Sequence, residues 1–227
     1  MIKTVFLDLD DTLFDFLRSE RVAIAETLSS FGIKPTDEVK KRYSEINRAM
    51  WQQLELGTMT REQILVRRFE LLFEELGVNA DGREARLCYE RNLSGSYFYI
   101  DGAEEILTDL SKKYNLYLMS NGTAAVQDRR IAASGIAKYF KGIFISERVG
   151  YNKPSIEFFE RCFAEIPDFH KEESIIIGDS LSSDIQGGIN AGILTCHYNS
   201  RDEKKDGTTP DYVIKTLEEL PLLLASI

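Results

Sequence analysis

The sequence has few cysteines and no hydrophobic run long enough to cross a membrane. Cys88, Cys162 and Cys196 are far apart and form no CxxC pair, so we expect reduced residues of the core. No apolar run approaches the roughly 18 residues of a membrane span. The first apolar stretch is too short and too acidic at its end to be a signal peptide. We therefore expect a cytoplasmic protein without a membrane partner.

Positive charge is also scarce, since 28 Lys and Arg face 37 Asp and Glu, for a formal net charge of -9. Proteins bind the phosphate backbone of nucleic acids mainly through Lys and Arg, so this deficit argues against a nucleic-acid partner. A small anion in a locally positive pocket stays compatible with it. Hydrophobic residues make up 43% and charged residues 29%, as in ordinary globular proteins. One charged loop, Arg201–Asp206, is expected to be a solvated turn.

Acidic residues follow the first predicted strand. Residues 4–7 are mostly apolar and should form a strand that is buried on both faces. Asp8, Asp10 and Asp11 come directly after it. Because side chains alternate along a strand, Asp8 and Asp10 should leave its carboxyl end on the same side, where open α/β sheets bind their ligands. The sequence therefore predicts a site with two carboxylates at this strand end.

The chain from residue 16 to about residue 99 has helical hydrophobic spacing. We expect one helix capped by Ser19, a second after Thr36, a third that begins with a capping box at Thr60, and a fourth over residues 81–93. The first helix should bury Val22, Ala25, Leu28 and Phe31. We therefore expect an all-helical domain over residues 16–99, inserted into a core of residues 1–15 and 100–227.

Predicted strands and helices alternate after residue 101. Strands are expected at residues 116–119, 143–145, 175–177 and 194–198, and helices at residues 102–113, 124–134, 155–164 and 182–191. This alternation is typical of a parallel sheet with helical crossovers on both faces. We expect an α/β fold with a Rossmann-like core.

Polar residues stand at the carboxyl ends of the later strands as well. They are Ser120, Asn121 and Gly122 after residues 116–119, Asp179 and Asp184 after residues 175–177, and Lys153 before the helix at residues 155–164. The carboxyl ends of parallel strands share one edge of the sheet, so these residues should converge on Asp8 and Asp10.

Taken in order, these segments resemble a known family. They are Asp8-Leu9-Asp10-Asp11-Thr12, Ser120-Asn121, Lys153 and Gly178-Asp179-Ser180-Leu181-Ser182-Ser183-Asp184. Their order, strand placement and spacing together resemble the four motifs of the haloacid dehalogenase-like hydrolases. The helical segment resembles the cap that covers the active site in one branch of that family. The resemblance implies a Rossmann-like core with a mobile lid.

The resemblance also implies a role for each motif residue. Asp8 matches the nucleophile, which would form an aspartyl-phosphate, and Asp10 matches the general acid and base. Branches that cleave carbon–halogen bonds lack an acid at this second position, so Asp10 favours a phosphatase. Lys153 matches the cation that offsets negative charge. Ser120 matches the group that binds phosphate, with Thr12, Asn121 and Gly122 as further donors nearby; capping of the next helix explains Thr12 equally well.

A magnesium ion is implied by the same resemblance, because a carboxylate cannot approach a phosphate without charge compensation. Its expected ligands are the Asp8 carboxylate, the Asp10 backbone carbonyl and the Asp179 carboxylate. Asp184 should act through water or hold Lys153 in place.

Other polar and aromatic residues receive weaker assignments. Phe14 and Phe16 leave the first strand towards the helical segment and are candidates to line a substrate pocket. Asp11 is expected to be a turn acid, and His170 and His197 to be structural.

One branch of the family matches more closely. The matching stretches are residues 7–16, 120–123, 146–154, 178–180 and 183–188. They resemble bacterial pyrimidine 5′-nucleotidases that act on noncanonical nucleotides, which implies hydrolysis of UMP, dUMP, dTMP and modified analogues. A sugar-phosphate or phosphoglycolate phosphatase of the same family is the first alternative. A receiver-like phosphoacceptor module is a remote one. The expected partner is a small phosphorylated metabolite, and the sequence favours neither monomer nor dimer.

Overall fold

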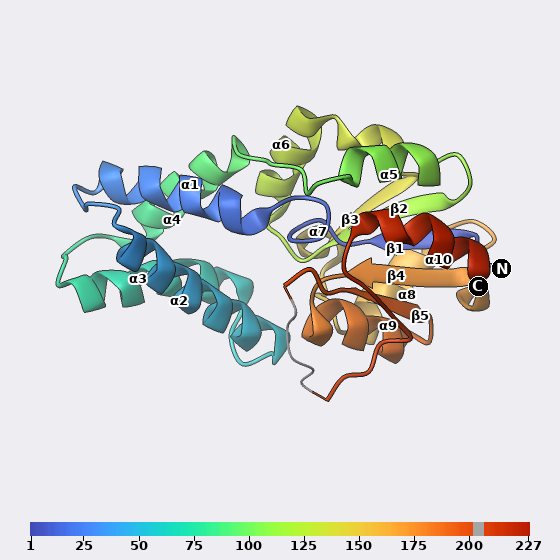
Figure 1. Ribbon diagram of the computed structural model, residues 1–227. Helices are drawn as coiled ribbons and strands as arrows, with labels where there is room; N and C mark the ends of the chain where they lie inside the picture. The colour runs from blue at the N-terminus through green and yellow to red at the C-terminus, as the bar shows by residue number, and fades with distance from the viewer. Residues whose placement is uncertain (202–206) are drawn as a thin grey trace. The chain divides into compact units, whose positions relative to one another are not determined.

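A computed structural model describes residues 1–201 and 207–227 (Figure 1). Residues 202–206, which make up most of the charged loop predicted over Arg201–Asp206, lie outside the described residues. The chain divides into two compact units. The sheet unit consists of Met1–Asp15 and Phe98–Ile227, and the helical unit of Phe16–Tyr97. The chain therefore returns to the sheet unit two residues before the predicted boundary at residue 100.

The described part of the sheet unit contains one parallel sheet with the strand order β3-β2-β1-β4-β5-β6. The strands are β1 (Thr4–Leu7), β2 (Asn115–Ser120), β3 (Gly142–Ile145), β4 (Ser174–Gly178), β5 (Leu194–Tyr198) and β6 (Tyr212–Ile214). The first strand of the chain lies in the middle, where Val5 is in register with Leu116 of β2 and Ile175 of β4. The predicted parallel α/β fold is confirmed, although β6 was not predicted.

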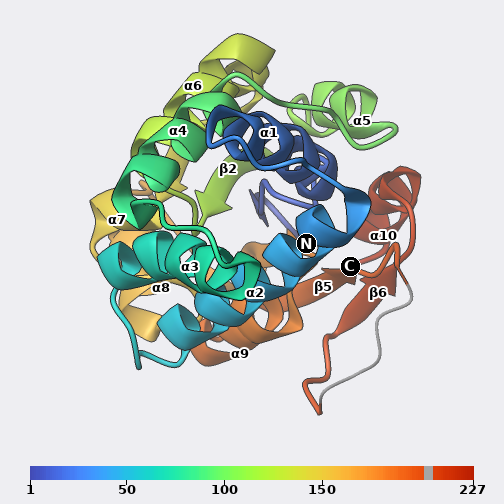
Figure 2. The ribbon, with the colours of Figure 1, turned by 90° about the vertical axis from the view of Figure 1, so that its left-hand side faces the viewer.

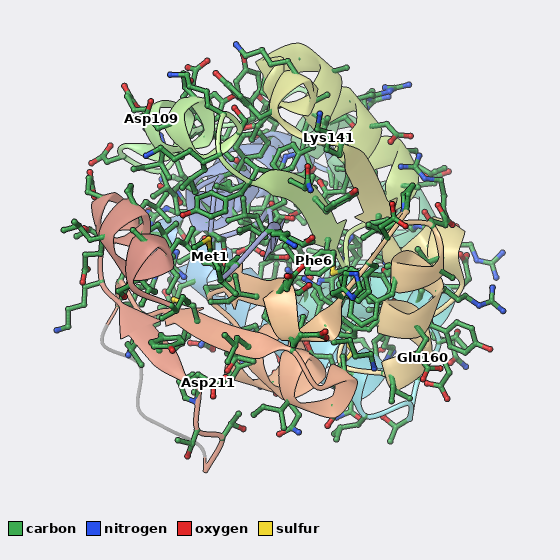
Figure 3. The ribbon with its side chains drawn as sticks, turned by 90° about the vertical axis from the view of Figure 1, so that its right-hand side faces the viewer. Met1, Phe6, Asp109, Lys141, Glu160 and Asp211 are labelled. Atoms are coloured by element: carbon green, nitrogen blue, oxygen red, sulfur yellow. The ribbon has the colours of Figure 1, made fainter. Side chains whose placement is uncertain are left out.

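Helices cover both faces of this sheet. They are α5 (Ala103–Leu110), α6 (Ala124–Ser134), α7 (Ser146–Val149), α8 (Ile156–Ala164), α9 (Gln186–Ala191) and α10 (Leu220–Ser226). Figures 1 and 3 show α5 and α6 on one face, and α8 and α9 on the other. Phe6 and Ile176 pack in one cluster with Phe158 and Phe159 of α8. Burial on both faces explains why β1 and β4 are almost continuously apolar.

The helix predicted over residues 182–191 begins differently from expectation. Leu181–Ile185 form a π-helical turn, and α9 follows from Gln186. Such wider turns are frequent at functional sites, and this one carries Asp184. Hydrophobic spacing does not distinguish a π turn from an α turn, so this turn could not be predicted.

The helical unit contains α1 (Phe16–Ser30), α2 (Asp37–Glu55), α3 (Arg61–Leu76) and α4 (Gly82–Ser94). Figure 2 shows α1 beside α4, and α2 beside α3. Thr36 caps α2 by accepting a hydrogen bond from the Val39 N–H, and Thr60 and Gln63 form the predicted capping box. These two helix starts and the cap of α4 by Asp81 follow the expected side-chain chemistry.

The prediction for α1 was wrong in its cap and in most of its buried face, although Leu28 is buried as expected. The helix begins at Phe16, so Ser19 lies inside it rather than at its cap. Val22 is 39% exposed, whereas the buried positions include the polar side chains of Ser19, Glu20 and Thr27. Glu20 accepts hydrogen bonds from Ser44 and Asn47 of α2, which satisfy its carboxylate inside the bundle. Because polar residues occupy part of the buried face of α1, the positions of the hydrophobic residues alone indicated the wrong face of the helix.

Candidate active site

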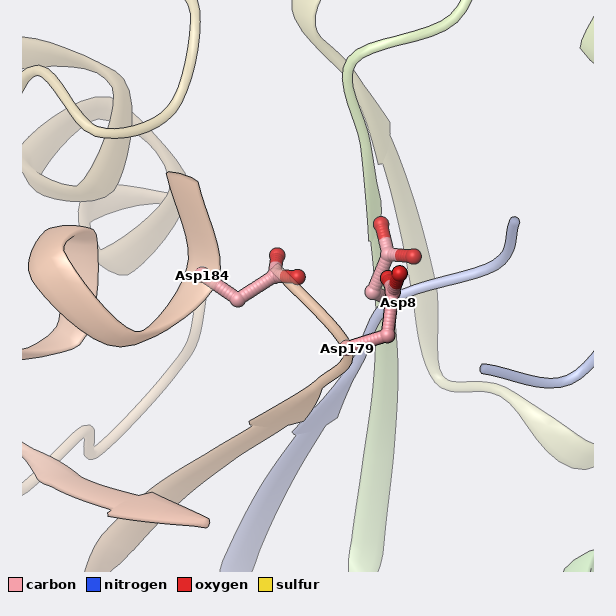
Figure 4. Close-up of side chains that lie close together, drawn as sticks. All are labelled: Asp8, Asp179 and Asp184. Carbon is pink, nitrogen blue, oxygen red and sulfur yellow. The ribbon is translucent and has the colours of Figure 1, made fainter. Parts of the chain in front are cut away.

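The carboxyl edge of the sheet brings three acidic side chains together. Asp8 follows β1, Asp179 follows the neighbouring strand β4, and Asp184 comes from the π-helical turn. Figure 4 shows the Asp8 and Asp179 carboxylates side by side and that of Asp184 directed towards them. One carboxylate oxygen of each lies within 4.8 Å of the other two. The predicted convergence of distant segments on one edge therefore holds for these three residues.

Lys153 joins two of these carboxylates. Its Nζ donates to Asp8 Oδ1 at 2.6 Å, to Asp184 Oδ1 at 2.6 Å and to the Met119 carbonyl oxygen at 2.8 Å. The side chain is 1% exposed, so all three ammonium protons are used inside the protein. Asn121 fixes the Lys153 backbone from both sides, because its amide accepts from the Lys153 N–H and donates to the Lys153 carbonyl, each at 2.9 Å. The Asn121 side chain thus supports the lysine.

Three carboxyl groups face one ammonium group here. Burial raises the pKa of Asp8 to about 8, an effect that Lys153 opposes and Asp184 reinforces. Burial and the Asp8 charge raise the pKa of Asp179 well above its usual value. Although burial opposes its charged form, Asp184 and Asp8 raise the pKa of Lys153. The lysine is therefore a permanent cation in a cluster that holds more carboxyl groups than one ammonium group can neutralise.

This excess suits a hard divalent cation. Carboxylate oxygens are the ligands that Mg²⁺ prefers, and a cation would offset both the burial and the mutual repulsion that raise the two aspartate pKa values. Asp184 is less available, because Lys153 occupies its Oδ1 and the Ser180 N–H donates to its Oδ2 at 3.1 Å. Gly178 leaves room for this carboxylate, since a Cβ there would overlap it. The arrangement fits Asp8 and Asp179 as direct ligands and Asp184 as the partner of Lys153.

Asp10 has a different set of partners from Asp8. Arg130 donates to its Oδ1 at 2.6 Å and Gln127 to its Oδ2 at 2.7 Å. Gln127 also donates to the Ser120 hydroxyl at 2.9 Å. The Asp10 side chain remains 26% exposed, so a reacting group can reach it. The two aspartates of the first motif are thus held by separate parts of the fold.

Two of the predicted substrate contacts, Thr12 and Phe14, are buried in the structure. Thr12 is fully buried, and its hydroxyl accepts a hydrogen bond from the Asp179 N–H at 3.1 Å, so it neither faces substrate nor caps a helix. Phe14 is also fully buried, with its ring packed edge-on against Tyr99 and beneath the Arg130 guanidinium. Both residues lock the loop after β1 in place. Phe16, half-buried, is the first residue of α1.

Several contributing residues escaped the sequence reasoning. Gln127 and Arg130 lie on the buried face of α6 with Val126 and Ile131, where polar residues are unexpected. Polar residues at buried positions of a helix were the sequence signal that could have identified them.

His197 lies with Nε2 2.9 Å from the Asp179 carbonyl oxygen, in agreement with its predicted structural role. Asp11 adopts a left-handed backbone conformation and pairs with Arg201, at 2.7 Å for the shorter contact.

Comparison with known proteins identifies the family. A family model of haloacid dehalogenase-like hydrolases matches residues 2–192. The chain belongs to the haloacid dehalogenase-like hydrolase family. This membership confirms the resemblance carried by the four motifs and contradicts the receiver-module alternative.

Three bacterial proteins are among those with similar sequences. The HAD-hydrolase YfnB of Bacillus subtilis is 39% identical over 96% of this chain and 93% of its own. The pyrimidine 5′-nucleotidase PynA of Streptococcus pneumoniae is 36% identical with the same coverage. The pyrimidine 5′-nucleotidase YjjG of Escherichia coli is 28% identical over 97% and 96%.

Solved structures of the haloacid dehalogenase-like hydrolase family share the fold. The magnesium-bound crystal structure of YfnB superposes with a TM-score of 0.94, at 38% identity and with 98% of each chain covered. L-2-haloacid dehalogenase from Xanthobacter autotrophicus has a TM-score of 0.80 over all of both chains at 16% identity, which shows a common fold alone. Among the described residues, no helix is long and apolar enough to span a membrane.

Proposed function

We propose that this protein is a Mg²⁺-dependent phosphomonoesterase that hydrolyses pyrimidine nucleoside 5′-monophosphates through an aspartyl-phosphate. The observation that carries the proposal is the division of the Asp8–Asp10 pair between two sets of partners. Asp8 contacts a buried lysine, and Asp10 contacts an arginine and a glutamine. Two carboxyl groups in distinct environments can take distinct roles in one reaction. A dehalogenase would have no use for the second carboxyl group.

In the first step, Asp8 attacks phosphorus. Lys153 holds Oδ1 of Asp8, which leaves Oδ2 as the attacking oxygen. The new Oδ2–P bond forms as the bond from phosphorus to the nucleoside 5′ oxygen breaks, and Asp10 gives its proton to that oxygen. The products of this step are the nucleoside and an acyl phosphate on Asp8.

In the second step, water cleaves the acyl phosphate. Asp10, now a carboxylate, removes a proton from the water that attacks phosphorus, and the P–Oδ2 bond breaks. Asp8 is restored as a carboxylate and inorganic phosphate is released. Lys153 stays within 2.6 Å of Asp8, where its charge offsets the negative charge of the phosphoryl group.

Bound Mg²⁺ would supply the positive charge that lets a carboxylate approach a phosphate. Asp8 and Asp179 would hold it with their carboxylates and Asp10 with its backbone carbonyl. Asp184 would keep Lys153 in position through their 2.6 Å contact. Ser120 would donate its hydroxyl proton to a phosphate oxygen, with Gly122 and the Asn121 backbone nearby.

The choice of a pyrimidine nucleotide rests on sequence similarity. PynA and YjjG, both named pyrimidine 5′-nucleotidases, match this chain over nearly its full length. We propose that the helical unit, residues 16–97, serves as the cap that reads the base, with Phe16 at its start. The three free, buried cysteines support a reducing, cytoplasmic environment. The pyrimidine substrate, the role of the cap and the cytoplasmic environment are thus proposed in addition to the phosphatase chemistry.

A substrate panel tests the proposal. Released phosphate would be measured with Mg²⁺ for UMP, dUMP and dTMP, and for phosphoglycolate, hexose phosphates and glyceraldehyde 3-phosphate. Higher kcat/KM on the pyrimidine nucleotides is the expected result. A preference for the sugar or glycolate phosphates would leave the phosphatase chemistry standing and refute the pyrimidine assignment. Absence of phosphate release from every compound would refute the proposed function.

A further inference from the structure

A closed hydrogen-bond circuit links Asp10 to α6. Arg130 Nη1 donates to Asp10 Oδ1 at 2.6 Å and to Gln127 Oε1 at 2.8 Å. Gln127 Nε2 donates to Asp10 Oδ2 at 2.7 Å, which closes the circuit. Residues three positions apart lie on the same face of a helix, so α6 presents both donors together. Both carboxylate oxygens of Asp10 are therefore oriented by a single rigid element.

The same glutamine orients the hydroxyl of Ser120. The Ser120 Oγ accepts hydrogen bonds from Gln127 Nε2 at 2.9 Å and from the Gly122 N–H at 3.1 Å. A hydroxyl has two acceptor lone pairs and one proton to donate. With two donors already directed at its oxygen, Ser120 must direct its own proton elsewhere, and a bound phosphate is the acceptor that the proposed reaction supplies.

The circuit is enclosed on its other sides. Arg130 and Gln127 are 0% and 1% exposed, and the Arg130 guanidinium lies 5.3 Å from the centre of the Phe14 ring. Gly122 gives the Gln127 amide its space, because a Cβ at that position would overlap it. A buried guanidinium and amide have little freedom to move, so the direction of the Asp10 carboxylate is set before a substrate arrives.

We propose that Gln127 and Arg130 are positioning residues that aim Asp10 at the leaving-group oxygen, and that Gln127 also aims the Ser120 proton at the phosphate. This inference rests on the proposed phosphatase function. Proton transfer depends on a donor and acceptor held at hydrogen-bond distance, so a carboxyl group that rotates freely loses rate without losing its chemistry.

The leaving group of the substrate distinguishes positioning from mere stability. A nucleoside 5′-alkoxide is a poor leaving group and needs a proton, whereas p-nitrophenolate leaves without one. The ratio kcat/KM covers the steps up to departure of the alcohol, so comparison of UMP with p-nitrophenyl phosphate isolates proton donation by Asp10. A purely structural ion pair would affect both substrates alike.

The experiment uses the full chain with Mg²⁺ and the variants Arg130→Met, Arg130→Lys and Gln127→Ala. Arg129→Met, an exposed neighbour on α6, is the matched control and should keep wild-type rates on both substrates. Arg130→Met should lower kcat/KM for UMP about 30-fold, less than the full contribution of about 10²- to 10⁴-fold from general acid catalysis because Asp10 itself is kept, and for p-nitrophenyl phosphate by less than about threefold. Arg130→Lys, which keeps the charge, should restore part of the loss.

Gln127→Ala should show both effects. We expect a moderate loss on both substrates, because Ser120 loses a donor, and a further loss of about tenfold that is confined to UMP. In an Asp10→Asn background, Arg130→Met should change kcat/KM for UMP by less than about threefold, because residues that act through one another are not additive.

Equal losses on both substrates, or full additivity with Asp10→Asn, would overturn the positioning role. Circular dichroism would report whether each variant folds. If Arg130→Met does not fold, Gln127→Ala and Arg130→Lys decide the question, since both leave Asp10 with a partner. A wild-type protein that hydrolyses neither substrate would instead refute the proposed function, which is a separate outcome.

Discussion

Replacement of Lys153 by Met should destabilise the protein in a manner that depends on pH. The change removes the three hydrogen bonds that Nζ makes with Asp8, Asp184 and the Met119 carbonyl, and it leaves two buried carboxyl groups without their cation. Breaking a buried ion pair from one side typically costs about 3–5 kcal/mol. The Lys153 and Asp184 side chains are each 1% exposed, so solvent offers little relief.

The free energy of protonating a buried carboxyl group gives a second estimate of this destabilisation, with the same magnitude. The variant can avoid an unpaired carboxylate by binding one proton, for which the unfolded chain has a pKa of about 3.9. Binding that proton at pH 7 costs about 4 kcal/mol, since each pH unit corresponds to about 1.4 kcal/mol. At pH 5 the same proton costs about 1.5 kcal/mol. The destabilisation relative to wild type should therefore shrink by about 2.5 kcal/mol between pH 7 and pH 5.

The sign follows from linkage. In the variant, the buried carboxyl group that binds the extra proton has a pKa above the value that it has in the unfolded chain. The contribution of this group to stability is therefore complete below about pH 4 and is lost as pH rises. Urea unfolding followed by circular dichroism at pH 5 and pH 7, without metal, measures the difference. Lys141→Met is the control, because Lys141 is exposed and precedes the amino end of β3, whereas the acidic cluster lies at the carboxyl edge of the sheet. A cost below about 1 kcal/mol, or one equal at both pH values, would refute the reasoning.

Three further predictions concern turnover, metal and thiols. Asp8→Asn should abolish phosphate release while circular dichroism stays unchanged; appreciable turnover would exclude the covalent route. The pKa values of Asp8, about 8, and Asp179 are raised, so without metal their contribution to stability is complete below about pH 4 and declines as pH rises towards 8. The rise in Tm on addition of Mg²⁺ over EDTA should accordingly be larger at pH 8 than at pH 6, and scanning fluorimetry that found the reverse would contradict the metal assignment. Burial raises the pKa of Cys196 to about 12 and that of Cys162 further, so at pH 8 about one Cys196 in 10⁴ is a thiolate, and neither should react with a disulfide reagent until urea is added.

The sequence predicted the parts of this protein that follow from chain direction and local chemistry. Asp8 and Asp179 were identifiable because parallel strands place their carboxyl ends on one edge, and polar residues at those ends interrupt apolar runs. Lys153 was identifiable only from its position between the second and fourth motifs of the family. The capping box at Thr60 is set by neighbouring residues alone. Such features need no knowledge of what packs across the fold.

Features that depend on contacts between distant segments were missed or misjudged. Thr12 and Phe14 looked like candidates for substrate contact, yet tertiary packing buries both. An arginine is normally expected at the protein surface. Arg130 can be buried only because Asp10 and Phe14 contact its guanidinium group. The polar face of α1 depends in the same way on Ser44 and Asn47 of another helix. Hydrophobic periodicity in the sequence does not indicate which distant residues will contact a buried polar side chain.

The contacts that build the site join segments far apart in the chain, and this has a consequence for folding. The Lys153–Asp8 pair spans 145 residues, the Arg130–Asp10 pair 120, and the hydrogen bond between Asp179 and Thr12 spans 167. Contacts of such large sequence separation carry a high loop-closure cost and form late. No single helix or strand contains a complete site, so recovery of turnover during refolding would report the assembly of β1, β2 and β4 with the segments between them rather than formation of any one element.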